Sequence, residues 1–140
     1  MDGGRTRHYR DLLVWQKAMG LTKNIYRLTE SLPRKETFGL QSQIRRASVS
    51  VPSNIAEGHG RLDDGHFRQF LAVSRGSLFE LQTQVELCAD LGYLSVNAFR
   101  EVMEQCEEIA RMLNGLLSSI AKDQGKRAND ARKLTDSLTR

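Results

Sequence analysis

The sequence predicts an all-α protein, an antiparallel up-down-up-down four-helix bundle, and three observations support this prediction. Apolar residues recur every three or four positions along four long segments of the 140-residue chain, which is the period of an amphipathic helix. Only two prolines interrupt the chain, and strand-like alternation is scarce. Short connections join the segments, so neighbouring helices are expected to run antiparallel.

The first helix is expected from Tyr9 to Leu32, because Pro33 disfavours further helix. Its apolar face is wider than one seam, since a second stripe lies beside the main one. The main stripe is Val14, Ala18, Leu21, Ile25, Leu28 and Leu32, and the second is Trp15, Met19, Thr22 and Tyr26. A face this wide is buried in the bundle or shared with a subunit contact. The candidates for this core or oligomer stripe are Val14, Trp15, Ala18, Leu21 and Ile25.

The second helix is expected from Glu36 to Glu57, with small residues that permit close approach of a neighbouring helix. Its apolar stripe is Leu40, Ile44, Ala47, Val51 and Ile55. Pro52 lies inside this pattern and removes one backbone donor, which frees the carbonyl of Ser48. Nearby Ser and Asn side chains are expected to satisfy that carbonyl, and Gly58 and Gly60 are expected to end the helix.

The third helix is expected to begin at an Asp63-Asp64 N-cap and to end at Gly92. Gly76 lies inside it and suggests a close helix crossing. The fourth helix is expected to begin after Ser95 and to lose its apolar pattern at Ala121. The sequence thus divides into a basic N-terminal arm (1–8), the bundle (9–121) and a flexible basic tail (122–140).

The N-terminal residues are polar and basic and lack the apolar core of a secretory signal. The chain contains no run of about 20 apolar residues that would span a membrane. We therefore expect a cytoplasmic protein.

Charge is distributed unevenly along the chain. Residues 1–62 contain 11 Lys and Arg against 5 Asp and Glu, whereas residues 63–121 contain 4 against 9. The tail over residues 122–140 is basic again, with 6 against 3. A bundle with this asymmetry is expected to meet an anionic partner with its basic side, or to join basic and acidic sides between subunits.

The sequence contains no phosphate-binding loop, nucleophile elbow or di-iron motif. His59, Asp63, Asp64 and His66 form a cluster that could bind a metal, but a polar loop with an Asp cap explains them better. We therefore expect no enzyme, no catalytic residues, no metal and no cofactor. Two cysteines lie on helical stripes about 10 Å apart by helix register, beyond disulfide reach, and are expected to be buried thiols. These are Cys88 and Cys106.

Basic residues of the first two helices and their connection are the stronger functional candidates, because phosphate recognition requires several cations on one surface. The candidates for nucleic-acid contacts are Lys17, Lys23, Arg27, Arg34, Lys35, Arg45 and Arg46. The competing interpretation is a solvated helix face on a protein-interaction scaffold with no nucleic-acid role. The nine aromatic residues are expected mostly in core stripes, with no RNA-recognition motif.

Several short motifs support a family resemblance over residues 9–121. They are Leu13-Val14-Trp15-Gln16-Lys17-Ala18, Phe38-Gly39-Leu40, Gln43-Ile44-Arg45-Arg46-Ala47, Ser53-Asn54-Ile55-Ala56-Glu57-Gly58, Phe70-Leu71, Arg75-Gly76-Ser77, Glu80 and Leu91-Gly92-Tyr93-Leu94. In these residues the chain resembles the bacterial four-helix-bundle proteins encoded in intervening sequences of 23S rRNA genes.

This resemblance implies a four-helix bundle that assembles as a homopentamer. The chain is also similar in fold to the accessory variability proteins of diversity-generating retroelements, which are basic pentamers that bind nucleic acid and a reverse transcriptase. It departs from that branch because its bundle is close to neutral, with 12 Lys and Arg and 13 Asp and Glu over residues 11–121. The implied partners are other copies of the chain, with RNA, DNA or a protein partner as further possibilities and no membrane.

Overall fold

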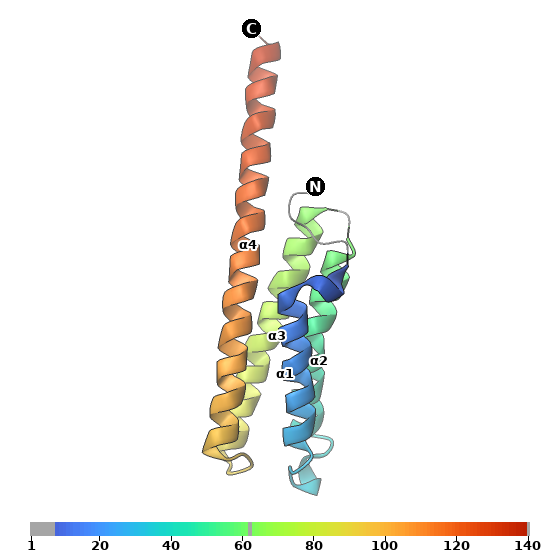
Figure 1. Ribbon diagram of the computed structural model, residues 1–140, viewed down its shortest axis with the longest axis vertical. Helices are drawn as coiled ribbons and strands as arrows, with labels where there is room; N and C mark the ends of the chain where they lie inside the picture. Colours follow the sequence, from blue (N-terminus) through green and yellow to red (C-terminus); the bar gives the residue numbers. More distant parts are fainter. Residues whose placement is uncertain (1–7, 62, 140) are drawn as a thin grey trace.

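The four periodic segments form four helices that pack side by side in the computed structural model, which describes residues 8–61 and 63–139 (Figure 1). The elements are η1 (Tyr9–Asp11), α1 (Leu13–Thr29), η2 (Arg34–Glu36), α2 (Leu40–His59), α3 (Asp64–Asp90) and α4 (Val96–Leu138). Both α1 and α3 pack against α2 and α4, so α1 and α3 occupy opposite corners of the bundle. The predicted all-α, up-down-up-down bundle is confirmed. The predicted N-terminal arm lies, apart from His8, outside the described residues.

The core is filled by residues spaced three or four apart on each helix, as the periodicity predicts. Leu21, Leu71, Leu78, Leu81 and Leu113 have no exposed surface. Burial of each such side chain contributes about 1.5–3 kcal/mol to the free energy of unfolding. Among the described helices, none has the combined length and apolar character needed to cross a membrane.

The carbonyl freed by Pro52 is satisfied from another helix. Pro52 lies inside α2, and the Oγ1 hydroxyl of Thr22 in α1 donates to the carbonyl oxygen of Ser48 at 2.9 Å. The sequence predicted that Ser and Asn side chains near Pro52 would supply this donor. Thr22 supplies it instead, because the close packing of α1 on α2 brings its hydroxyl to the point where α2 lacks a backbone N–H donor.

The close helix approach lies at a different glycine from the one the sequence indicated. An added Cβ at Gly58 would lie 2.6 Å from the Cβ of Phe70 and 3.2 Å from a ring carbon of Phe67, so α2 and α3 touch there. An added Cβ at Gly76 would meet no atom within 4 Å. The predicted crossing at Gly76 is therefore wrong for contacts within one chain, since this glycine is exposed on the outer side of α3.

The predicted starts of α3 and α4 and the predicted turn after α3 are confirmed. Asp63 caps α3 by accepting from the backbone N–H of His66 at 2.8 Å, and Ser95 caps α4 by accepting from that of Ala98 at 3.1 Å. The turn after α3 places Gly92 at φ 79°, a left-handed conformation that glycine adopts without steric cost. These caps satisfy backbone groups that have no partner within the helix.

The fourth helix continues well beyond the expected boundary at Ala121, and its C-terminal half extends past the other three helices (Figure 1). Its residues over 122–138 include Lys, Arg, Ala and Gln, which favour helix even without a core to pack against. Arg127 ties this extension to the start of α3 through an ion pair with Asp64 at 2.7 Å. From Gly125 to Thr139 every residue is exposed.

Candidate functional site

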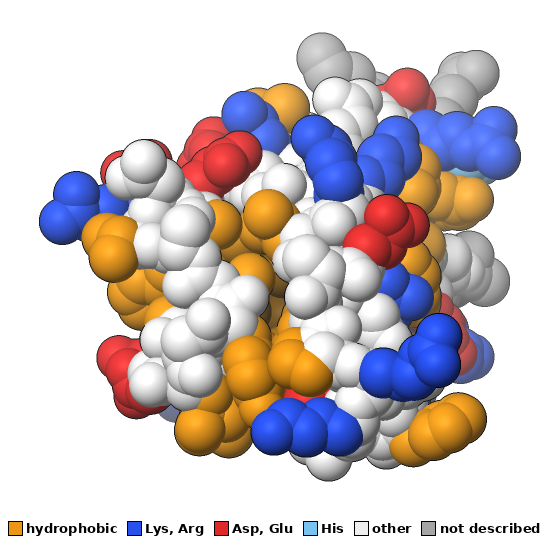
Figure 2. Space-filling model, turned by 90° about the horizontal axis from the view of Figure 1, so that it is seen from below, with side chains coloured by type: hydrophobic (Ala, Val, Ile, Leu, Met, Phe, Trp, Pro, Cys, Tyr) orange, Lys and Arg blue, Asp and Glu red, His pale blue; other side chains and the backbone are white. Residues whose placement is uncertain are grey.

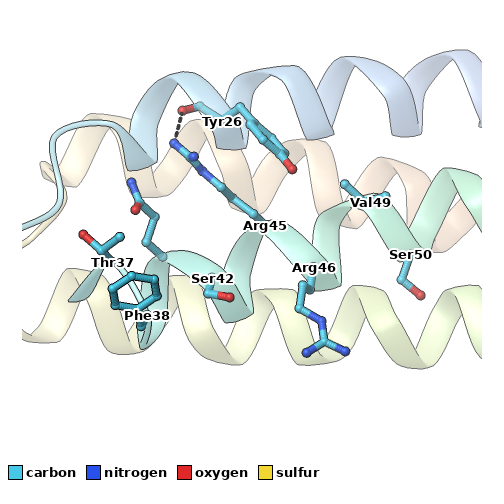
Figure 3. Close-up of a pocket in the computed structure, with 9 residues that line it drawn as sticks. Tyr26, Thr37, Phe38, Ser42, Arg45, Arg46, Val49 and Ser50 are labelled. Atoms are coloured by element: carbon cyan, nitrogen blue, oxygen red, sulfur yellow. Dashed lines mark hydrogen bonds between the residues drawn. The ribbon is translucent and has the colours of Figure 1, made fainter.

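A surface groove of about 670 Å³ lies between α1 and the first half of α2 (Figure 3). We call it the α1–α2 groove. Its lining residues are Tyr26, Thr37, Phe38, Gln41, Ser42, Arg45, Arg46, Val49 and Ser50. None of these nine is a His, Asp or Glu. The lining combines apolar surface with guanidinium groups, which suits binding of an anionic or mixed surface.

Arg45 builds one wall of the groove and is occupied within the chain. Its Nε donates to Thr29 Oγ1 at 2.9 Å, and a terminal nitrogen donates to the carbonyl oxygen of Tyr26 at 3.2 Å (Figure 3). Its guanidinium also lies 4.6 Å from the centre of the Tyr26 ring. Because α1 ends at Thr29, its last carbonyls lack helical donors, and a cation is favourable there. Arg45 therefore fixes the end of α1 against α2.

Arg46 is adjacent in sequence but points in another direction. Successive helical residues do not share a face, and Arg46 extends away from Arg45 (Figure 3). It lines both the α1–α2 groove and a second hollow, of about 340 Å³, that also contains Ser77 and Glu80 of α3. In the described part of the chain Arg46 has no ion pair within 4.0 Å. Its charge remains available to a partner.

Phe38 stands at the edge of the groove with 96% of its surface exposed. The expectation that the aromatic residues mostly occupy the core is confirmed only in part, because Phe67 is buried and Trp15, Tyr93 and Phe99 are half-buried against the core. Tyr26 and Phe79 are also substantially exposed. Phe38 precedes Gly39 and α2, so it has no place in the helical period. Its position outside every apolar stripe was the only signal in the sequence of its exposure.

The predicted cations fall into two groups. Lys17 is paired with Glu108 of α4 at 3.3 Å, and Arg45 is occupied as described above. The others are exposed, and in the described part of the chain none forms an ion pair: Lys23, Arg27, Arg34, Lys35 and Arg46. Viewed from the end that carries the α1–α2 and α3–α4 connections, Lys and Arg side chains are more frequent on the α1 and α2 half (Figure 2).

The predicted core or oligomer stripe lies in the core of a single chain. Val14, Ala18, Leu21 and Ile25 are buried. Trp15 is half-buried and packs edge-on against Tyr9, with ring centres 5.1 Å apart. Val14, Ala18, Leu21 and Ile25 are therefore not available for contact with another molecule.

The residues weighed as a metal site serve as helix caps and ion pairs. Asp63 caps α3 and contacts the His66 ring, and the hydrogen bond from the His66 N–H holds the pKa of Asp63 below its ordinary value. Asp64 pairs with Arg127. Among the described residues, no three His, Cys, Asp or Glu side chains are grouped so that they could hold a metal ion.

The two cysteines are free, buried thiols, as predicted. Burial raises the pKa of Cys106 to about 12 and that of Cys88 to about 11. A thiol held neutral in this way behaves as a small apolar side chain rather than as a nucleophile.

The outer side of α3 is a feature that the sequence analysis missed. Opposite its buried face, α3 exposes three large apolar residues, Val73, Phe79 and Leu87, and its C-cap residue Leu91 is exposed as well. The signal was present as apolar residues off the core stripe, but a strong core stripe on the same helix obscured it. Large apolar side chains exposed along one helix face are typical of surfaces that contact other molecules.

Comparison with known proteins bears on this arrangement. The model of the family described as 23S rRNA-intervening sequence protein matches residues 10–115, which include all of α1, α2 and α3 and the first part of α4. The chain belongs to this family. The predicted resemblance is thereby confirmed, and residues beyond 115, including the α4 extension, lie outside the match.

A solved structure gives the same result for the fold. It is a protein of unknown function from the S23 ribosomal protein family of Bacteroides thetaiotaomicron VPI-5482, with a TM-score of 0.71 and 21% sequence identity. The alignment covers 75% of the chain described here and 98% of the Bacteroides chain. No protein with a curated description matches the chain.

Proposed function

We propose that this member of the 23S rRNA-intervening sequence protein family is a non-catalytic homo-oligomer that binds RNA through the cations of α1 and η2. One observation carries the proposal. Lys23, Arg27, Arg34 and Lys35 are exposed, and in the described part of the chain none forms an ion pair. Cations that are not neutralised within the protein gain most from phosphate, because each contact releases counterions from the nucleic acid.

The family and the assembly add support. The printed name of the matching family refers to 23S rRNA, which makes RNA the first nucleic acid to test. Assembly into a homo-oligomer, a pentamer according to the family resemblance, would repeat four weak cationic contacts on every subunit. Repeated contacts raise overall affinity without any new interaction. The proposal includes the cytoplasmic location expected from the sequence.

A second candidate is a homo-oligomeric scaffold that binds protein and has no nucleic-acid role. The apolar outer side of α3 favours it, since that surface suits protein contact and not phosphate. Both candidates share self-association, and RNA binding separates them.

The test is fluorescence anisotropy of a labelled structured RNA titrated with the protein at several salt concentrations. We expect the logarithm of the association constant to fall linearly with the logarithm of salt concentration. Each phosphate contact contributes about 0.7–0.9 to the slope. The single variant Lys23→Gln should lower the slope by about that amount. The matched control is Lys17→Gln, which removes a charge already paired with Glu108.

The combined variant of the four cations should lose most of the salt-dependent binding. Equal slopes for the wild type and this combined variant would reject the proposed RNA surface. No binding of the wild type at low salt would reject RNA binding itself and leave the scaffold.

A further inference from the structure

The outer side of α3 has the composition of a protein interface. Gly76, Phe79, Thr83 and Leu87 follow a helical spacing on the side opposite the core. Phe79 is 51% and Leu87 45% exposed. Gly76 leaves the backbone bare, because an added Cβ there would meet no atom of its own chain. We call the outward surface over residues 76–91 the α3 ridge.

The α3 ridge and the α1–α2 groove have opposite charge. From Gly76 to Ser95 the chain contains three carboxylates, Glu80, Glu86 and Asp90, and no Lys or Arg. The groove contains two arginines and no carboxylate, and Phe38 and Val49 supply exposed apolar surface beside them. Both surfaces therefore have an apolar centre. The groove adds positive charge and the ridge adds negative charge, and this complementarity favours their contact.

The two surfaces lie at the same height along the bundle axis. The hydroxyls of Ser50, at one end of the groove, and Ser77, at the start of the ridge, are 2.8 Å apart. Beyond the other end of the groove, the Tyr93 hydroxyl donates to the carboxylate of Glu36 at 3.1 Å. The groove and the ridge both lie between these two contacts along the bundle axis. The groove faces outward between α1 and α2, whereas the ridge lies on α3, diagonal to α1.

We propose that the α1–α2 groove of one chain receives the α3 ridge of a second copy. This inference rests on the homo-oligomer of the proposed function and names its contact. Phe38 and Val49 pack against Phe79 and Leu87 of the neighbouring chain, and Arg46 faces the carboxylates of the neighbouring ridge. The contact joins two different surfaces of identical chains, so it is heterologous and every copy retains one surface to continue the assembly.

Equal height of the two surfaces favours a closed ring over a filament. When a heterologous contact involves no shift along the helix axis, each added chain is related to the previous one by a rotation alone. Such an assembly closes into a ring when the rotation angle divides a full turn. All α4 extensions then project from one side of the ring. Lys23 and Arg27 do not line the groove, so they remain available to RNA.

The experiment measures molar mass by size-exclusion chromatography with light scattering. Phe38→Asp replaces an apolar side chain of the groove with a charge, and Phe79→Asp does the same on the ridge. Both side chains are exposed, so circular dichroism should show unchanged helix content. The matched control is Leu134→Asp on the α4 extension, which is also an exposed apolar residue but lies on neither surface. We expect an oligomer for the wild type and for the control, and monomers for the other two variants.

Mixing the two monomeric variants gives the sharper result. The Phe38→Asp protein keeps an intact ridge and the Phe79→Asp protein keeps an intact groove. Their equimolar mixture should form a one-to-one complex that grows no further. Monomers that stay separate on mixing, or either variant at the wild-type mass, would overturn the pairing while leaving the homo-oligomer standing. A monomeric wild type would overturn the homo-oligomer together with the pairing.

Discussion

Replacement of Gly58 by alanine tests the close approach of α2 and α3. Helix propensity alone predicts that alanine stabilises, because glycine is about 1 kcal/mol less favourable inside a helix. The structure predicts the opposite sign. The new Cβ would lie 2.6 Å from the Cβ of Phe70 and 3.4 Å from the carbonyl oxygen of Phe67. Neither is the mobile end of a flexible side chain, so one helix must shift.

The magnitude follows from the two opposing effects. Overpacking a close contact costs about 1–3 kcal/mol, and a separation of 2.6 Å places Gly58 at the upper part of that range. After the propensity gain is subtracted, we expect the free energy of unfolding to fall by about 2 kcal/mol. Gly115→Ala is the matched control, because Gly115 is exposed in α4 and an added Cβ would meet no atom within 4 Å. It should stabilise by about 0.5–1 kcal/mol.

The assay is urea unfolding followed by circular dichroism at 222 nm, with all proteins at one chain concentration because association adds to stability. The difference between the two variants cancels much of the propensity gain and isolates the steric cost at Gly58. A Gly58→Ala protein as stable as the Gly115→Ala protein would refute the close packing of α2 and α3 at this point.

Three further predictions concern the core. Leu81→Ala should lower the free energy of unfolding by about 2–5 kcal/mol in the same assay, since Leu81 is fully buried; a smaller loss would contradict its central position. Thr22→Val should cost about 1–3 kcal/mol by leaving the Ser48 carbonyl without its donor, whereas Thr22→Ser should retain most of the stability. Cys88 and Cys106 should resist a thiol reagent at pH 8 until urea unfolds the chain. Their raised pKa values predict a constant free energy of unfolding below about pH 9, the ordinary thiol pKa, and a loss as pH rises toward about 11 and 12. Rapid labelling of the folded protein would contradict the burial of both thiols and, with it, their raised pKa values.

The sequence predicted those parts of the fold that depend on residues close together in the chain. The four helices, the caps Asp63 and Ser95 and the turn at Gly92 all follow from signals within a few residues, whereas α1 ends at Thr29, before the stop expected at Pro33. A helical period also fixes which positions face inward, because the side chains that share a face are three or four residues apart.

The α4 extension shows where such reasoning fails. The apolar pattern fades after Ala121, so a pattern-based boundary falls there, whereas the helix continues to Leu138. Helix propensity and the Arg127–Asp64 ion pair extend the helix without a buried face. The ion pair joins residues 63 positions apart, a separation that no local pattern can show.

The candidate site depended on tertiary structure to a greater degree. The sequence proposed seven cations as equals, but packing assigned Lys17 to Glu108 and Arg45 to the end of α1, and left the rest exposed. The physical reason is that periodicity gives the direction of a side chain around its own helix and says nothing of what the neighbouring helix presents there.

By itself, then, the sequence determined four amphipathic helices, their order, their inward faces and the family. Only the tertiary structure decided that Thr22 serves the carbonyl freed by Pro52, that Gly58 and not Gly76 is the close contact, and that Phe38 stands outside the core. Each of these depends on how one helix is placed against another. That placement is set by packing complementarity summed over many contacts between distant residues, which a local period does not encode.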